Sequence, residues 1–467
     1  MSPRSLILRR IDRRIKGTGE TERLELRPGV NLISGPPNSG KSVWMRMLDF
    51  TLGDDKPFRR RFNTEILHKY DRVDAFATAG QDEYSICRSW EPHTEGERRI
   101  QLAERSLGAK RFQEVLMRSL GIPLVTILRG EDFSPHLISL RVLMRHFFRQ
   151  QRFWSDIADE QYADEVRASI LVLVGATDLL AIAEQREVKE LRQAMASSAL
   201  RARSLEDVLH AFSDSYFAAA ASEFKGAITA RRVRDELEVE SQNLRDTGRE
   251  LVSQFAREKL DTILDLAFKR GKLIEQIRVL KVYESLWAQL EALEEAKRDA
   301  SIRLSRIRDR LISNEDTGYA RGQLNKLAHG MNEYLTEINN AEPGMWKHKH
   351  PIEVEDRPER IVFRVGPMEW SKALGGTDSL FFLLSYHYAM LKMSADPDAN
   401  CPGFAMIDLP ADFSGEPVRE KENLVIMPFM QLLKDRRYGH CQLIIAGRGF
   451  DEATNCNNIK LTETYLA

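Results

Sequence analysis

The first part of the chain is a succession of short apolar runs separated by polar turns. Apolar residues at 30–33 suit a buried strand, and the residues that follow position 42 have the spacing of an opening helix. A turn at Ala79–Gln81 separates two runs that alternate between apolar and polar positions, which predicts a β-hairpin. In total the pattern predicts strands at 6–15, 24–26, 30–33, 71–78 and 83–88, and helices from 43, at 112–120 and at 139–148.

The middle of the chain, residues 179–315, changes to a helical pattern with almost no proline. Apolar residues step alternately by three and four positions, which is the seam of a coiled coil. A reversal near Asp246–Gly248 would give two antiparallel arms of roughly 65 residues, each on the order of 100 Å long at 1.5 Å per residue. Interruptions at Gly226 or Gly271 would shorten them, and a helical bundle folded on the head is the alternative. The seam residues are Val188, Leu191, Met195, Ser198, Ala202, Leu205, Leu209 and Phe212, then Leu286, Leu290, Leu293, Lys297, Ala300, Leu304, Ile307 and Leu311.

Short apolar runs return in the last part of the chain. The pattern predicts strands at 360–364, 403–408 and 441–446, and helices at 380–393 and 424–433. We therefore expect three regions: an N-terminal lobe at 1–178, a coiled-coil hairpin at 179–315 and a C-terminal lobe at 316–467.

The loop between the strand at 30–33 and the next helix matches the phosphate-loop pattern G-x-x-x-x-G-K-[ST] at every fixed position. In such a loop, backbone N–H groups surround phosphate oxygens, the lysine binds the β- and γ-phosphates, and the hydroxyl binds Mg²⁺. The alternative is a plain Gly-Pro turn. The loop consists of Gly35, Pro36, Pro37, Asn38, Ser39, Gly40, Lys41 and Ser42.

Two further sites suit phosphate chemistry. Gly375 and Gly376, followed by Thr377, open an apolar helix whose N-terminal N–H groups suit a second phosphate contact. The strand at 403–408 ends in Asp408, the pattern of a Walker B carboxylate that holds the Mg²⁺ shell. Arg448 follows the strand at 441–446, where a γ-phosphate sensor is expected.

Composition limits the classes of function. The chain has 69 Lys and Arg against 70 Asp and Glu, which argues against a dedicated nucleic-acid coat but leaves a local basic patch open. Four cysteines without metal-ligand spacing indicate a reducing compartment. The N-terminal residues lack the apolar core of a signal peptide, and the most apolar segment, 170–183, is too short to span a bilayer. We expect a cytoplasmic protein without a membrane partner.

In order, the motifs are a phosphate loop, a glutamine region at Gln150–Gln151, a coiled-coil hairpin, a Gly-Gly helix, a Walker B strand and a sensor strand. This order resembles the SMC/RecN/RecF class of ABC ATPases, α/β proteins whose P-loop head is split into two lobes by an antiparallel coiled coil. Within the class, the chain resembles the ATPase of bacterial three-component ABC systems of anti-phage defence.

The resemblance implies that ATP and Mg²⁺ are the ligands. Lys41 would bind the β- and γ-phosphates, while Ser42, Asp408 and Gln151 would bind Mg²⁺, with Gln150 an alternative to Gln151. The segment 373–377, including Gly375, Gly376 and Thr377, would take the place of the L-S-G-G-Q signature. Two heads would sandwich two ATP molecules, which predicts a homodimer or a heterodimer with a related head.

Three residues depart from the class. Leu374 stands at the signature serine, Leu409 at the catalytic glutamate after Asp408, and Arg448 at the switch histidine. Leucine cannot deprotonate water, and arginine can bind phosphate but cannot relay a proton. Asp412 is a candidate replacement base. We therefore predict strong ATP binding with slow or partner-dependent hydrolysis.

The leading hypothesis is an ATP-gated sensor in a defence complex with a middle component, an effector such as a nuclease, and DNA. Two alternatives stay open: an ATP-hydrolysing repair or recombination protein of the RecN/RecF type, and a non-catalytic structural subunit held together by ATP.

Overall fold

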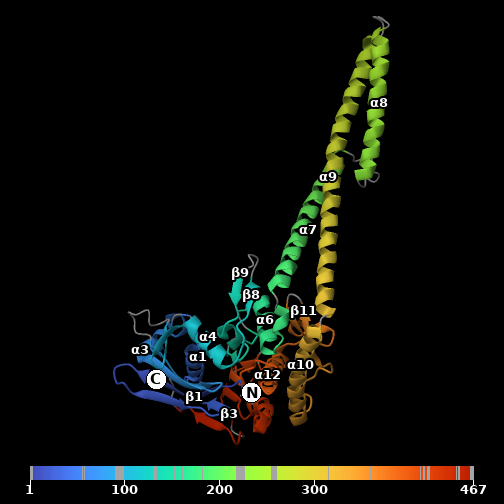
Figure 1. Ribbon diagram of the computed structural model, residues 1–467. Coiled ribbons are helices and arrows are strands. Elements are labelled where there is room, and N and C mark those ends of the chain that lie inside the picture. The colour runs from blue at the N-terminus through green and yellow to red at the C-terminus, as the bar shows by residue number, and fades with distance from the viewer. Residues whose placement is uncertain are drawn as a thin grey trace. The chain divides into compact units, whose positions relative to one another are not determined.

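The computed structural model describes two compact units, which we call the head unit and the helical unit (Figure 1). The head unit comprises Met1–Ile182 and Ile312–Ala467, and the helical unit comprises Ala183–Leu311. Within these spans the described residues are 4–54, 56, 58–89, 99–129, 134–151, 154–158, 161–180, 182–216, 227–253, 260–313, 315–357, 360–410, 412–413, 416–417, 421–448, 450 and 453–462.

A five-stranded parallel sheet lies at the centre of the head unit. Strand β17 (Gln442–Ala446) lies between β3 (Gly29–Ser34), which leads into the phosphate loop, and β14 (Phe404–Asp408). Every residue of β14 and β17 is buried, as expected for central strands covered on both faces. The order across the sheet is β10 (Phe148–Arg149), β14 (Phe404–Asp408), β17 (Gln442–Ala446), β3 (Gly29–Ser34) and β18 (Asn457–Lys460).

A six-stranded antiparallel sheet forms the second layer of the head unit. Burial alternates along β4, so one face of this strand is covered and the other is more open. The predicted hairpin is confirmed as β4 and β5. The order is β2 (Thr21–Glu25), β1 (Leu6–Ile15), β4 (Tyr70–Ala79), β5 (Asp82–Ser89), β6 (Arg99–Leu102) and β7 (Arg105–Gly108).

Helix α12 (Gly376–Met393) is strongly apolar and is buried on nearly all sides. It packs against α10 (Glu315–Ala341), a helix that the hydrophobic pattern did not predict. The other head helices of eight or more residues are α1 (Lys41–Thr51), α4 (Ala109–Ser119), α6 (Ala163–Leu173) and α13 (Glu422–Lys434).

Short elements complete the head unit. They are helices α2 (Phe58–Arg61), α3 (Thr64–Lys69), α5 (Leu140–Met144) and α11 (Trp370–Ala373), and strands β8 (Thr126–Arg129), β9 (Ser134–Leu137), β11 (Ile352–Arg357), β12 (Arg360–Val365), β13 (Met368–Glu369), β15 (Asp412–Phe413) and β16 (Glu416–Pro417).

The predicted helix at 139–148 is wrong at its C-terminal end. Helix α5 ends at Met144, and Phe148–Arg149 form β10 instead. The N–H of Met406 donates to the carbonyl of Phe147 at 2.7 Å, and Phe148 lies beside Met406 in a parallel register. Pairing with the edge of β14 therefore outweighs the helical spacing of this segment.

The helical unit contains α7 (Ile182–Tyr216), α8 (Ala227–Ser253) and α9 (Leu260–Ser313). Leu209, Ala230, Tyr283 and Leu290 form its buried apolar cluster. The predicted seam residues Ala202, Leu205 and Leu286 pack against that cluster, whereas Lys297 is exposed. The α/β class predicted for the head, with long helices inserted between its two chain segments, is confirmed.

The predicted reversal at Asp246–Gly248 is wrong, because these residues are helical. Asp246–Gly248 are inside α8, which continues to Ser253, and Gly271 does not interrupt the 54-residue helix α9. Glycine in an exposed helix costs about 1 kcal/mol, which a long helix paired with a neighbour can offset.

The ion pair Arg234–Glu284 joins α8 to α9, and Lys281 lies 3.0 Å from Glu238. Gly226 lies outside the described residues. At 1.5 Å per residue, α9 is about 80 Å long.

No helix within the described residues is long and apolar enough to cross a membrane.

Candidate nucleotide-binding site

The phosphate loop connects β3 to α1 at the carboxyl end of the parallel sheet. Its backbone is left-handed at Asn38 (φ 63°) and at Gly40 (φ 86°), the N-cap of α1. A Cβ on Gly35 would lie 2.6 Å from the carbonyl oxygen of Leu461 and 2.7 Å from Ser39 Oγ. Glycine is therefore required where the loop leaves the strand, and the turn leads the chain directly into the N-terminus of α1.

Lys41 is folded over the loop. Its ammonium donates hydrogen bonds to the carbonyls of Gly35 at 2.7 Å and Pro36 at 2.8 Å, and to Ser39 Oγ at 3.3 Å. Burial lowers the pKa of Lys41, while the charges of Asp408 and Glu422 raise it. The lysine is thus a partly buried cation at the mouth of the loop, placed to exchange carbonyl oxygens for phosphate oxygens.

Three oxygen-bearing side chains from separate segments meet beside the loop. The hydroxyl of Ser42 donates to the Oε1 atom of Gln151 at 3.4 Å. Asp408 ends β14 with 5% of its surface exposed, and it is hydrogen-bonded by the Ser42 side chain and by the backbone of Gln151. Gln151 follows β10, the strand beside β14, so the sheet order itself brings the glutamine to Asp408.

Burial raises the pKa of Asp408 to about 6, although the Ser42 hydrogen bond and the charges of Lys41 and Arg46 lower it. Desolvation disfavours the charged form of a carboxylate unless a cation compensates. A carboxylate of this kind is well suited to a site that receives a divalent cation.

The oxygens of Ser42, Gln151 and Asp408 are hard donors of the type that Mg²⁺ prefers. They fit the expected metal, and the loop with Lys41 fits the phosphates of a nucleotide. Gln150, the alternative to Gln151, is half-buried.

The Gly-Gly segment opens α12 as expected. Gly375 is the N-cap, Gly376 has a φ of 56°, and no side chain caps the first turn. A Cβ on Gly375 would meet no heavy atom within 4 Å, so the N-terminal end of the helix is accessible. Thr377 is half-buried in this turn. These N–H groups can bind an anion presented from outside the subunit.

Of the three residues that differ from the expected motifs, two are buried and one is exposed. Leu374 is 9% exposed and Leu409 is 4% exposed, so both belong to the core. The N–H of Leu409 donates to the carbonyl of Ala446 at 2.9 Å, which extends the β14–β17 ladder past Asp408. Arg448 is exposed, with its charge close enough to Lys41 to lower the pKa of that lysine. The side chain of Asp412, in β15, lies outside the described part of the chain.

Sequence reasoning missed Glu422. This first residue of α13 is 1% exposed and accepts the backbone N–H of Arg448. An acidic residue in the first turn of a helix ordinarily complements the helix dipole at the surface, so the pattern contained no signal for a buried role.

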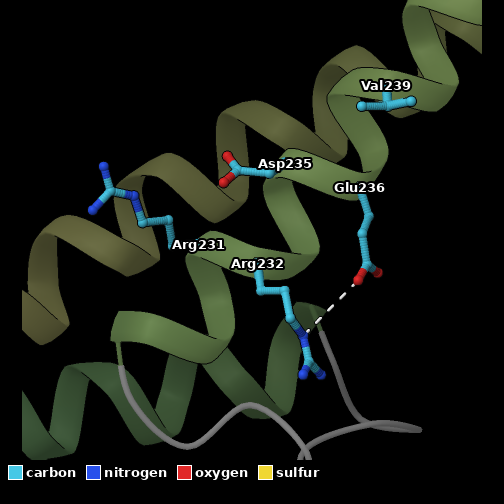
Figure 2. A pocket seen from close by; sticks show the side chains of 5 residues that line it. All are labelled: Arg231, Arg232, Asp235, Glu236 and Val239. Atoms are coloured by element: carbon cyan, nitrogen blue, oxygen red, sulfur yellow. Dashed lines mark ion pairs between the residues drawn. The ribbon is translucent and has the colours of Figure 1, made fainter.

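The helical unit carries a separate hollow on α8, lined by Arg231, Arg232, Asp235, Glu236 and Val239 (Figure 2). Arg232 and Glu236 form an ion pair at 3.9 Å, one turn apart. Charges of both signs line this surface, which does not match a polyphosphate.

The chain is similar to solved structures of two kinds. The Smc head domain of Pyrococcus furiosus with an extended coiled coil, bound to the C-terminal domain of ScpA, is 14% identical with a TM-score of 0.46. The alignment covers 95% of this chain and 90% of that one. The recombination mediator RecF with ATPrS is 12% identical with a TM-score of 0.37, and the coverage is 97% and 95%.

A second SmcHead structure, bound to the C-winged helix domain of ScpA, is 10% identical with a TM-score of 0.43, over 95% of this chain and 89% of that one. No protein-family description matches the chain, and no curated protein sequence matches it.

Proposed function

We propose that the protein is an ATP-binding switch whose heads join around the nucleotide. The observation that carries this proposal is the meeting of Ser42, Gln151 and Asp408 beside an intact phosphate loop. These three groups come from α1, the segment after β10 and the end of β14, and a plain turn at residues 35–42 would require no such arrangement.

In this proposal, the loop N–H groups and Lys41 bind the phosphates, and Ser42, Gln151 and Asp408 hold Mg²⁺. When bound, the metal would neutralise part of the phosphate charge. Arg448 binds the γ-phosphate as a fixed cation. Hydrolysis is slow or depends on a partner, because Leu409 offers no base to the attacking water.

The accessible turn at Gly375–Thr377 caps the γ-phosphate held by another head, so the active unit is a homodimer. By the resemblance noted above, we assign this dimer to a bacterial anti-phage complex as its DNA-sensing subunit. A middle component and an effector such as a nuclease would be its partners, in the cytoplasm.

The test measures ATP binding and particle mass with and without Mg·ATP. Wild-type protein should bind ATP and shift from monomer to dimer, whereas Lys41→Ala should lose both. Gly375→Glu should retain ATP binding but stay monomeric, because a carboxylate at the helix end repels phosphate. Gly248→Glu, at an equally open glycine in α8, is the matched control and should dimerise normally.

Equal ATP binding by wild-type and Lys41→Ala proteins would refute the proposal that ATP binds at the phosphate loop. A wild-type protein that stays monomeric with bound ATP would refute the proposal that ATP joins two heads.

A further inference from the structure

Glu422 is buried although it begins a helix. Only 1% of its surface is exposed, and glutamate is rarely buried to this degree without a specific partner. Both of its carboxylate oxygens accept the same backbone N–H, that of Arg448, at 2.9 and 3.1 Å. A charged acceptor makes this bond stronger than an ordinary backbone hydrogen bond.

The carboxylate is packed tightly against the segment after β17. A Cβ on Gly447 would lie 3.0 Å from Glu422 Oε1 and 2.6 Å from the ring of Phe450, so no side chain fits at this position. The N–H of Gly447 donates to the carbonyl of Ile33 at 3.0 Å, in the strand that leads into the phosphate loop. Glu422 therefore holds the first residues after β17 directly beside the nucleotide site.

The same carboxylate acts electrostatically on the phosphate loop. The pKa of Lys41 is lowered most by burial, is raised by Asp408 and then by Glu422, and is lowered by Arg448. Glu422 is thus a second buried carboxylate whose charge acts on this lysine. It comes from α13 rather than from the position after Asp408, where the side chain of Leu409 is in the core.

We propose that Glu422 is a positioning residue: it fixes the main chain of Gly447–Arg448 so that the Arg448 guanidinium faces the γ-phosphate. This inference rests on the proposed ATP site. Glu422 is assigned a positioning role through Arg448 because both of its carboxylate oxygens lie within hydrogen-bonding distance of the Arg448 backbone N–H. The affinity for ADP, which lacks the γ-phosphate, should therefore be unaffected when Glu422 is replaced.

The experiment measures the dissociation constants of ATP and ADP, each with Mg²⁺, for Glu422→Ala, Glu422→Gln, Arg448→Ala and the double variant Glu422→Ala/Arg448→Ala. Glu422→Ala should bind ATP about tenfold more weakly, the size of one charge-assisted contact, with ADP affinity within about twofold of wild type. Glu422→Gln keeps one acceptor oxygen and should stay within about threefold of wild type for ATP.

The double variant should match Arg448→Ala, since two residues that act through one contact are not additive. Glu65→Ala, at an exposed first-turn glutamate of α3, is the matched control and should change nothing.

Three results would overturn the proposal: equal losses for ATP and ADP, a Gln variant as impaired as the Ala variant, or an additive double variant. If Glu422→Ala does not fold, the Glu422→Asp variant is measured in its place. Its side chain is one methylene shorter, so it should still lose affinity for ATP but not for ADP. Unchanged ATP affinity in that variant would also overturn the proposal.

The Lys41→Ala variant distinguishes a wrong role for Glu422 from a wrong location of the ATP site. If wild type and Lys41→Ala bind ATP equally, the site itself is wrong. If only Lys41→Ala loses ATP, the site stands and the role of Glu422 is wrong.

Discussion

The Ser42 hydroxyl donates to the Gln151 amide oxygen at 3.4 Å, across 109 positions of sequence. The two residues reach each other because β10 joins the edge of the sheet beside β14, which delivers Gln151 to the end of the phosphate loop. A pair of neutral oxygens next to a buried carboxylate is a geometry that a divalent cation stabilises.

The first prediction concerns this pair. Gln151→Ala should weaken ATP binding about tenfold in Mg²⁺, as expected for loss of one metal-directed oxygen, and much less in EDTA. Isothermal titration with and without Mg²⁺ measures the difference. Gln150→Ala, one residue earlier, is the control, and an equal effect of both variants would contradict the assignment.

The second prediction follows from the pKa of Asp408, which burial raises from 3.8 to about 6. Between these values the native carboxyl keeps a proton that the unfolded chain loses, so the free energy of unfolding should fall as pH rises from about 4 to 6. The shift of roughly two pKa units corresponds to about 3 kcal/mol at most. Denaturant unfolding without nucleotide should show this slope, and Asp408→Asn should lack it.

A third prediction uses the same carboxyl in the liganded protein. Mg²⁺ requires the ionised form, and with a pKa of about 6 only about one tenth of Asp408 is ionised at pH 5. Mg²⁺-dependent ATP affinity should therefore drop about tenfold from pH 7.5 to pH 5. Titrations of wild type and Asp408→Asn across this range measure the effect, and an identical pH profile for the two proteins would count against it.

The fourth prediction concerns hydrolysis. Wild-type turnover should lie below about 1 s⁻¹, the low end of ordinary enzymes, and Leu409→Glu should not raise it. The Leu409 side chain is in the core, so a glutamate there should lower the free energy of unfolding by roughly 2–5 kcal/mol. Phosphate release and urea unfolding test both points, with Leu409→Gln as the uncharged comparison. A tenfold faster Glu variant would disprove the expectation.

The fifth prediction concerns the helical unit. Leu290 is 4% exposed in the cluster between α7, α8 and α9, so Leu290→Ala should destabilise that unit by about 2–5 kcal/mol. Ile302→Ala, in the same helix but 50% exposed, should change stability by no more than about 0.5 kcal/mol. Hydrogen exchange of the α9 amides compares the Leu290→Ala and Ile302→Ala variants. Equal protection in both would contradict the assignment of Leu290 to the buried seam.

Local features were predictable from the sequence. The phosphate loop, β3, β14, β17 and α12 were predicted because each is determined by residues within a few positions, through apolar spacing and glycine backbone freedom. The seam of α7 and α9 was predictable for the same reason, since its period repeats along each helix.

Only the tertiary structure decided which distant residues meet. Strand β10 replaced the end of a predicted helix because pairing with β14 outweighed local spacing, and α8 passed through Gly248 because it packs beside α9. Glu422 carried no local signal, since its role depends on a backbone N–H 26 positions away. The sequence by itself determined the loop that would bind phosphate. The order of strands in the sheet decided which side chains surround it, because contacts between segments far apart depend on packing that no short pattern contains.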